Sequence, residues 1–549
     1  MSLSTRRQRD ARPALTVPVG SARRRARSVL LVALLVATAC PGPSDEAEPQ
    51  PTASGPRPRA GGTLRVALAS DVDSLDPHLA TRPSSWWFAR ALHRGLYAFP
   101  SAPFPEGARA VPDLAEGFPE VSADGRSVRV AVRPGVAFGG PASREVTARD
   151  AAASIRRLIG TEVGIAPFFG PVESVDALDE HVVLLRLRRP MPELVSLLAH
   201  PQAAILPAET PAPVATVSRI APSGPYRLRS FRPERTIELE RNPSWSRTLD
   251  PVRGGWVDEI IATVTDPAAA RRDVLDGDLA LLVDPGPPDV PLPEPPEDAR
   301  TATSANGCVR YLFVNPSVAP FGSVHARRAV AHALDREAFV RDRPSAQAPR
   351  LLPPTVIGHA TAPVLAEDLD LASASLARAQ LPDGLDATLV VGDGERDAID
   401  AASVRRALAR AGIRVRIRTV PAATLYPNHY LRPGARTAMG IATWCADWPG
   451  LAGRGVLAPL ADPGSVGLRA GPARPQIGAG SVRSALAGAA VATEDEAAAR
   501  WAAADEAVVR AAVTIPLSWP AERVVIAADL QGWEASPMFP RGDPTAIWL

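Results

Sequence analysis

The 549-residue sequence contains no lysine, so arginine supplies all of its permanently charged basic side chains. A nucleotide-binding loop of the Gly-x-x-x-x-Gly-Lys type needs a lysine, and phosphate transfer of that type is therefore excluded. The sequence also lacks a Gly-x-Ser-x-Gly nucleophile motif, and its eight histidines never fall at the spacing of metal ligands. Paired carboxylates such as Glu367 and Asp368 stand in segments that read as solvated loops. These absences give no reason to expect an enzyme, a metal site or a cofactor.

The net positive charge of the chain comes from its N-terminus. The net charge of the chain is +2, but residues 1–40 hold eight arginines and one aspartate, a charge of +7. The remaining residues therefore carry −5. Because nucleic-acid-binding proteins present a basic face, this mildly acidic body argues against a nucleic-acid partner.

The N-terminus is typical of an export signal. Four arginines within residues 23–27 precede an apolar run, residues 29–39, that is too short to span a bilayer. The run ends in small residues before Cys40. This pattern resembles a bacterial lipoprotein signal, in which the cysteine becomes the N-terminus and carries lipid. The polar residues 41–60 then read as a flexible tether. The alternative is an ordinary secretory signal with an incidental cysteine.

Cysteine is rare, with three residues in the chain. If Cys40 is lipidated, Cys308 and Cys445 remain, either as a disulfide or as two buried free thiols. Export to an oxidising compartment favours the disulfide. It would close a loop of 137 residues, which the chain-entropy model values at roughly 4–5 kcal/mol.

Alternating strands and helices indicate an α/β fold. A chain of 549 residues exceeds a single core, so two or three domains are expected, and a composition of 46% apolar and 22% charged residues suits a globular protein. The clearest predicted elements are strands at 61–68, 127–132, 258–264 and 309–314, a hairpin of 224–228 with 236–240, a βαβ unit of 387–391, 396–411 and 413–420, and helices after Thr147 and at 325–340 and 494–513.

The segment 440–448 is the most informative stretch of the sequence. Residues 439–444 predict a short apolar strand that runs into a turn. Asp447 follows it, between Trp444 and Trp448, and is either a turn-forming acid or the anchor of a cation. The two tryptophans either line a ligand site or pack in the core, which is the commoner fate of tryptophan. We interpret this stretch as the floor of a ligand cleft in which Asp447 holds the positive end of the ligand.

Several short motifs together resemble a known family. They are Gly61-Gly62-Thr63-Leu64, Ser74-Leu75-Asp76-Pro77, Pro112-Asp113-Leu114-Ala115-Glu116, Gly224-Pro225-Tyr226, Leu239-Glu240-Arg241-Asn242-Pro243, Leu334-Asp335-Arg336 and Trp444-Cys445-Ala446-Asp447. In this order, and with the lipoprotein-like signal, residues 61–549 resemble the solute-binding component of an ATP-driven importer, family 5, the oligopeptide-binding class.

The resemblance implies a periplasmic-binding-protein fold of type II, with two α/β lobes hinged around a cleft and an additional inserted domain. Lobe I would comprise residues 61–100, 219–307 and 521–549. The inserted domain II would comprise residues 101–218, and lobe III residues 308–520.

The resemblance also implies roles for individual residues. The aspartate that matches Asp447 binds the peptide's α-ammonium, Trp444 lies beside it, and backbone groups matching Thr443 and Cys445 pair with the extended peptide. The loop 81–86, with Ser84 and Ser85, matches the opposite wall, although Pro83 in it has no N–H to donate. The cysteines that match Cys308 and Cys445 form a disulfide in this family.

The expected function is therefore the capture of short peptides outside the cell and their delivery to a membrane permease. The protein would act as a monomer, anchored to the outer face of the membrane through lipid on Cys40. The alternatives are the same scaffold with a non-peptide solute, such as a metal chelate or a glycan, and an exported hydrolase, for which no motif speaks.

Overall fold

The computed structural model describes residues 57–211, 220–285, 295–341 and 343–549. The predicted signal peptide, with Cys40, and most of the tether lie outside the described residues. Within the described part of the chain, no helix is long and apolar enough to cross a membrane.

The first sheet has five strands in the order β11-β1-β10-β9-β8. Strand β1 lies between β11 and β10 and pairs in parallel with both, while β8 and β9 form the predicted antiparallel hairpin. Leu64, Val66 and Leu68 of β1 are fully buried, as its alternating pattern requires. The elements of this region are β1 (Thr63–Leu68), α1 (Pro83–Leu92), β8 (Tyr226–Arg232), β9 (Thr236–Arg241), β10 (Glu259–Val264), α4 (Pro267–Asp276) and β11 (Leu281–Asp284).

A second, antiparallel sheet has four strands in the order β4-β5-β7-β6. Helix α2 (Ala148–Ile159) packs against β6 and β7 and starts at the predicted N-cap, Thr147. The Asp150 carboxylate accepts the Thr147 N–H, which satisfies one of the free amides at the helix start. The remaining elements are β2 (Tyr97–Ala98), β3 (Val111–Pro112), β4 (Glu120–Val121), β5 (Ser127–Ala131), β6 (Val172–Ala177), β7 (Val182–Leu187) and α3 (Leu194–Leu198).

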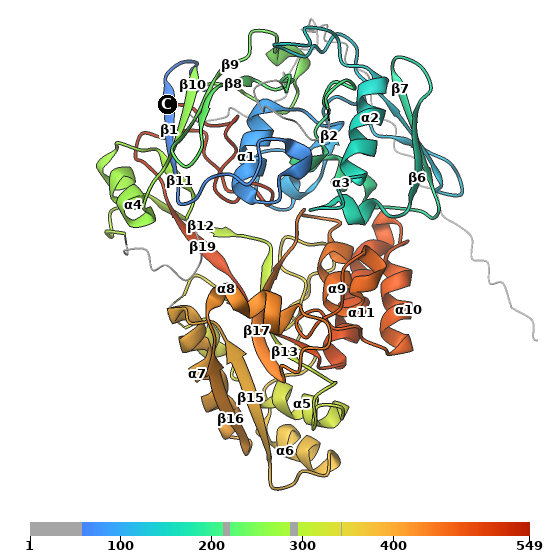
Figure 1. Ribbon diagram of the computed structural model, residues 1–549, viewed down its shortest axis with the longest axis vertical. Helices are drawn as coiled ribbons and strands as arrows, with labels where there is room; N and C mark the ends of the chain where they lie inside the picture. The colour runs from blue at the N-terminus through green and yellow to red at the C-terminus, as the bar shows by residue number, and fades with distance from the viewer. Residues whose placement is uncertain (1–56, 212–219, 286–294, 342) are drawn as a thin grey trace, which may run out of the picture. The chain divides into compact units, whose positions relative to one another are not determined.

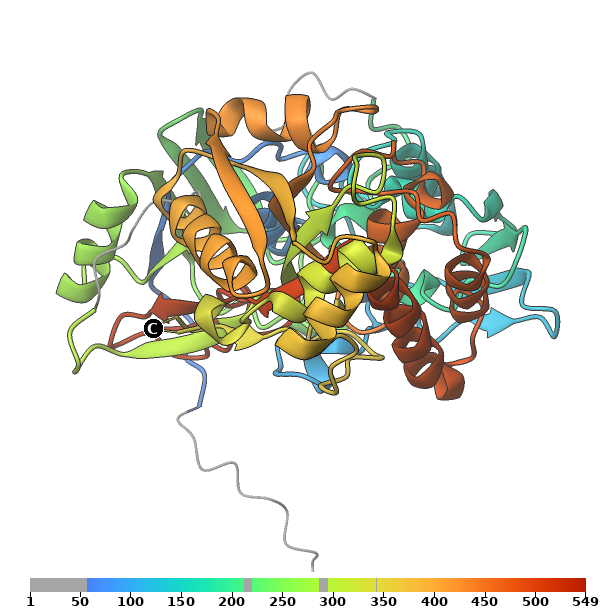
Figure 2. The same cartoon turned by 90° about the horizontal axis from the view of Figure 1, so that it is seen from below.

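The third sheet has six strands in the order β14-β18-β13-β17-β15-β16. The predicted βαβ unit is present, because β15 and β16 are parallel and α7 lies against both (Figures 1 and 2). The strands are β13 (Cys308–Val314), β14 (Ala346–Gln347), β15 (Leu385–Val391), β16 (Ile413–Thr419), β17 (Met439–Cys445) and β18 (Thr514–Trp519). The helices are α5 (Val324–Ala333), α6 (Leu369–Arg378), α7 (Glu395–Ala409), α9 (Gly453–Ala461), α10 (Gly480–Ala489) and α11 (Glu494–Arg510).

A two-stranded ribbon connects these regions. Strand β12 (Thr301–Ala305) leads into β13, and β19 (Ala521–Val525) returns antiparallel to it after β18 (Figure 1). Hinges in proteins are typically formed by a few residues in loops or at the ends of strands and helices, and the two strands of this ribbon are a connection of that kind. The domain boundaries expected from the sequence stay a prediction.

Two predicted segments differ from the structure. The helix predicted at 325–340 ends at Ala333, because Leu334 is extended and Asp335 starts a separate short turn by accepting the Ala338 N–H. The loop predicted at 81–86 is also wrong, since α1 already begins at Pro83. A proline is well suited to the first helical position, where its missing N–H is not needed.

Candidate functional site

The candidate site is built on the carboxyl end of β17. One edge of β17 pairs with β13 along its whole length, but the other edge pairs with β15 only at Met439 and Gly440. The N–H of Ala446 donates to the carbonyl of Gly307. The backbone N–H groups of the even-numbered residues of β17 therefore point toward β13. The N–H groups of Thr443 and Cys445 therefore face the other edge, which has no strand partner beyond Gly440 among the described residues.

Two tyrosine hydroxyls lie along that open edge. The Tyr430 hydroxyl accepts the Ile441 N–H at 3.1 Å, and the Tyr426 hydroxyl accepts the Thr443 N–H at 3.4 Å. Tyr430 is fully buried, whereas Tyr426 is exposed. Tyr426 therefore occupies the place where an incoming strand would pair with Thr443. No motif in the sequence marks this tyrosine.

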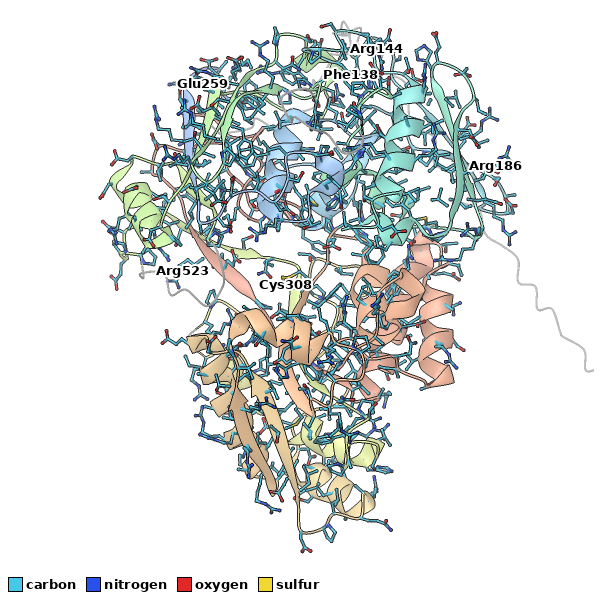
Figure 3. All side chains as sticks on the ribbon, in the orientation of Figure 1. Phe138, Arg144, Arg186, Glu259, Cys308 and Arg523 are labelled. Atoms are coloured by element: carbon cyan, nitrogen blue, oxygen red, sulfur yellow. A yellow bond between two sulfur atoms is a disulfide. The ribbon has the colours of Figure 1, made fainter. Side chains whose placement is uncertain are left out.

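A disulfide fixes the end of this strand. Cys308 and Cys445 lie directly opposite each other in the β13–β17 ladder, and their sulfurs are bonded. Their Cα atoms are 3.9 Å apart, as suits a pair that exchanges no backbone hydrogen bonds. Figure 3 labels Cys308 at the end of β13 near β12 and β19. The disulfide thus holds the backbone two residues before Asp447.

Asp447 is a half-buried carboxylate without a cation. Its side chain makes no hydrogen bond or ion pair with any residue that the structure describes, and burial raises its pKa to about 6. A desolvated carboxylate is costly unless it meets a positive charge. Among the described residues, no cationic side chain forms an ion pair with Asp447 to offset this cost.

The side chains of Trp86 and His200 come to this site from other parts of the chain. The rings of Trp86 and His200 meet edge to face at 4.5 Å. His200 accepts the Gln202 N–H at Nδ1, so its proton lies on Nε2, which has no hydrogen-bond partner among the described residues. Burial lowers the pKa of His200 to about 3, and the nearby backbone carbonyl of Asp447 opposes this shift. The imidazole is therefore neutral, and it lies beside Asp447.

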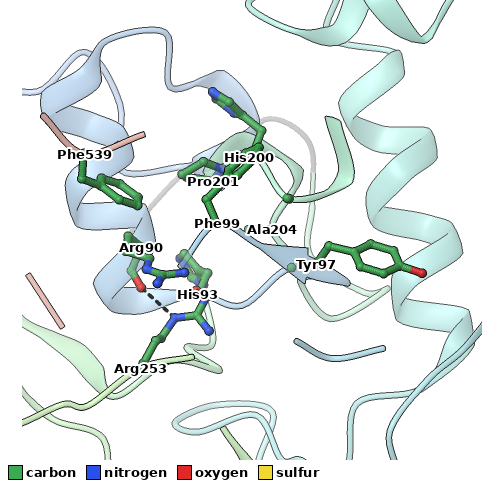
Figure 4. A pocket seen from close by; sticks show the side chains of 11 residues that line it. Arg90, His93, Tyr97, Phe99, His200, Pro201, Ala204, Arg253 and Phe539 are labelled. Carbon is green, nitrogen blue, oxygen red and sulfur yellow. Dashed lines mark hydrogen bonds between the residues drawn. The ribbon is translucent and has the colours of Figure 1, made fainter. Parts of the chain in front are cut away.

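No motif in the sequence marks His200, which precedes a proline in an irregular segment. His200 also lines a cavity of about 10 Å³, together with residues that include His93, Arg90 and Arg253 (Figure 4). A cavity of this size has room for about one water molecule and none for a peptide.

The side chains of Trp444 and Thr443 have hydrogen-bond partners within the protein. The Trp444 indole N–H donates to the Gly455 carbonyl at 2.9 Å, and the Thr443 hydroxyl accepts from Arg310 at 3.2 Å. Trp448 is 1% exposed and packs edge-on against Phe168 at 4.9 Å. For Trp448, core packing is the role that the structure supports.

Ser84 and Ser85 lie in the first turn of α1 and are buried. The Ser85 hydroxyl both accepts the Asp73 N–H and donates to the Asp73 carboxylate. A ligand contact of these two serines stays a prediction. Among the described residues, no group of three or more His, Cys, Asp or Glu side chains is placed to hold a metal ion.

The fold defines a class of protein. It is that of a type II periplasmic binding protein, a mixed α/β fold with several sheets. The chain belongs to the bacterial extracellular solute-binding proteins, family 5, whose model matches residues 109–452, more than half of the chain. As the description of the family says, its members are extracellular proteins that bind solutes.

Individual relatives are distant. A probable peptide ABC transporter periplasmic-binding protein of Sinorhizobium fredii is 26% identical over 298 residues, 51% of this chain and 54% of that protein. A di/tripeptide-binding protein of Pseudomonas aeruginosa is 24% identical over 342 residues, 58% of this chain and 60% of that protein. The matches thus span little more than half the length of these relatives.

A solved structure matches over a greater length. The structure of the clavulanic acid biosynthesis oligopeptide binding protein 2 is 28% identical in sequence and superposes with a TM-score of 0.82. The match covers 90% of this chain and 96% of that one.

Proposed function

We propose that this protein captures short peptides outside the cell and delivers them to the permease of an ABC transporter. The peptide ammonium would bind the Asp447 carboxylate, and the peptide backbone would pair with the open edge of β17 at Thr443 and Cys445. Main-chain pairing gives affinity without demanding particular side chains. The names of the distant relatives, which include peptide-binding and di/tripeptide-binding proteins, support a peptide ligand.

One observation carries the proposal, namely the unpaired, desolvated carboxylate at the end of an open strand edge. An α-ammonium supplies the missing charge and donates up to three hydrogen bonds of the stronger, charge-assisted kind. An extended peptide that starts at Asp447 can continue along β17, because the strand edge and the carboxylate are two residues apart.

Calorimetry with Asp447→Asn tests this proposal. The substitution keeps the shape of the side chain and removes its charge, so the peptide ammonium is desolvated against a neutral partner. Loss of one side of such a pair costs about 2–5 kcal/mol, and we expect an affinity loss on the order of 30-fold or more. N-acetylated peptides should bind the wild type poorly for the same reason, and the two losses should not add.

Equal affinity of the wild type for free and acetylated peptides would show that Asp447 does not bind an ammonium. Mass spectrometry of ligand retained during purification separates the peptide proposal from a non-peptide solute, such as a metal chelate or a glycan. Turnover of peptide or ester substrates would instead support the exported hydrolase.

We further infer that the protein is anchored as a monomer to the outer face of the membrane through lipid on Cys40. A short apolar core that ends in small residues before a cysteine supports lipoprotein processing. Cys40→Ala should leave the precursor unprocessed or release it to the medium. A variant with a mature-sized N-terminus that still partitions into detergent would contradict the lipid anchor.

A further inference from the structure

Strand β16 alternates apolar and arginine side chains. Ile413 is buried on one face, and Arg414, Arg416 and Arg418 are exposed on the other. The parallel register pairs Arg414 with Asp386 of β15, so the arginines share a face with Asp386 rather than with the buried Leu385 and Leu389. Helix α7 contacts both strands and covers the apolar face (Figure 2). The arginine face is turned away from that helix.

A groove of about 900 Å³ lies over the arginine face. Residues 428–438 form its other wall and add His429, Arg432 and Arg436. The lining contains five arginines, one aspartate and no glutamate, a charge of +4 with the histidine neutral. This concentration of positive charge contrasts with the −5 carried by the chain beyond residue 40.

Four of these five arginines form no ion pair within the described part of the chain. Arg414 forms two hydrogen bonds with Asp386, at 2.8 and 2.9 Å. Arg416, Arg418, Arg432 and Arg436 make no side-chain hydrogen bond or ion pair with any residue of the described chain. Like charges gathered in a hollow focus a positive potential, which attracts an anionic partner and speeds its association.

We propose that this groove is a docking site for an acidic, extended segment of a partner protein. Alternate residues of a strand lie about 6.7 Å apart, so Arg416 and Arg418 match carboxylates at alternate positions of an extended chain. Arginine also suits such a partner because its guanidinium binds carboxylates through two parallel hydrogen bonds. A planar membrane surface fits this site less well than an extended segment does, because the arginines line both walls of a groove.

The groove is separate from the site at Asp447. It lies along β15 and β16 and the segment before β17, whereas Asp447 follows the opposite end of β17. Its partner could therefore bind whether or not the candidate site holds a ligand, and the inference does not rest on the peptide-binding function.

Fluorescence anisotropy with the full-length mature protein tests the inference. The probe is a labelled, N-acetylated and C-amidated peptide of alternating Glu and Ala, with a Gln–Ala peptide as the neutral control. We expect the acidic peptide to bind, the Gln–Ala peptide to bind at least about tenfold more weakly, and binding to weaken as salt rises from 50 to 300 mM. Arg416→Glu with Arg418→Glu should weaken binding at least about fivefold. Arg405→Glu, an exposed arginine on α7, is the matched control and should not change it.

Amide hydrogen exchange adds a measurement that does not depend on a variant, because binding in the groove should slow exchange in residues 414–418. Equal binding of the Glu–Ala and Gln–Ala peptides, or unchanged binding by the double variant, would overturn the inference. Binding to phosphatidylglycerol vesicles but not to the acidic peptide would identify a membrane surface as the partner and would overturn it too.

Discussion

At the scale of the residue, the raised pKa of Asp447 links pH to stability. Its folded-state pKa of about 6 exceeds the ordinary value of 3.8, so the folded protein binds more protons than the unfolded chain between these pH values. The contribution of Asp447 to the stability of the ligand-free protein should therefore fall as the pH rises from about 4 to about 6. Asp447→Asn should remove this loss, and be more stable than the wild type at pH 7.5 by on the order of 1–2 kcal/mol.

Chemical denaturation of both proteins at pH 4 and pH 7.5 measures this difference, which should be close to zero at pH 4. Burial also raises the pKa of Asp505 to about 6, but that residue is shared by the two proteins and cancels in the comparison. A wild type that is as stable as Asp447→Asn at pH 7.5 would show that the carboxylate is well solvated.

Peptide affinity should show the opposite pH dependence. An ammonium needs the ionised carboxylate, so a proton on Asp447 competes with the ligand. Below a pH of about 6, wild-type affinity should fall by about tenfold per pH unit, and Asp447→Asn should show no such fall. Calorimetry at pH 7.5, 6 and 5 measures this. A parallel decline in both proteins would place the titrating group elsewhere.

At the scale of the element, the disulfide joins the ends of β13 and β17. Replacing both cysteines with serine reopens a loop of 137 residues, and we expect a loss of about 4–5 kcal/mol of stability in the chain-entropy model. Peptide affinity should fall as well, since the bond fixes the backbone that leads to Asp447. Denaturation and calorimetry with and without a reductant measure both effects.

The double serine variant is also the control, because its stability should not respond to the reductant. Non-reducing peptide mapping of exported protein that finds Cys308 and Cys445 as free thiols would contradict the disulfide.

Sequence patterns predicted some elements and not others. The alternation in β16 and the apolar run of β17 suffice to predict strands, and the motif around Asp447 indicates a site, because these signals are local. His200 and Tyr426 could not be predicted, since they reach the site through packing of segments that carry no periodic pattern. The α5 helix was predicted too long because its apolar spacing continues past Leu334, where the backbone becomes extended. The groove depends on residues 428–438 folding over β16, which no motif indicates.

At the scale of the whole molecule, one buried ion pair connects two regions that are far apart in sequence. Arg454 of α9 donates to Glu193, just before α3, at 2.7 Å, and both side chains are buried. The same guanidinium also donates to the Phe168 carbonyl, and Phe168 packs on Trp448 next to Asp447. The regions of the four-stranded and the six-stranded sheets therefore meet beside the candidate site.

This contact joins the expected inserted domain II to the expected lobe III, and we expect it to favour a closed arrangement of the molecule, so that its loss weakens binding at the site. Arg454→Met removes the ion-pair partner of the buried Glu193, and breaking a buried pair in this way typically costs about 3–5 kcal/mol. If the regions separate to hydrate Glu193, closure becomes less populated, and peptide affinity falls by the same factor as the closed fraction. We therefore expect Arg454→Met to bind peptide more weakly and to show a larger radius of gyration by X-ray scattering without ligand.

Two variants separate closure from simple destabilisation. Glu193→Leu with Arg454→Met removes both charges, so the contact can re-form as an apolar one, and affinity should recover towards that of the wild type. Arg500→Met breaks an exposed pair with Glu496, and should change neither affinity nor the radius of gyration.

If Arg454→Met loses stability while its affinity and radius of gyration stay at wild-type values, the pair stabilises the fold and takes no part in closure. If the double variant binds as weakly as Arg454→Met, a buried lone charge is not what opens the molecule.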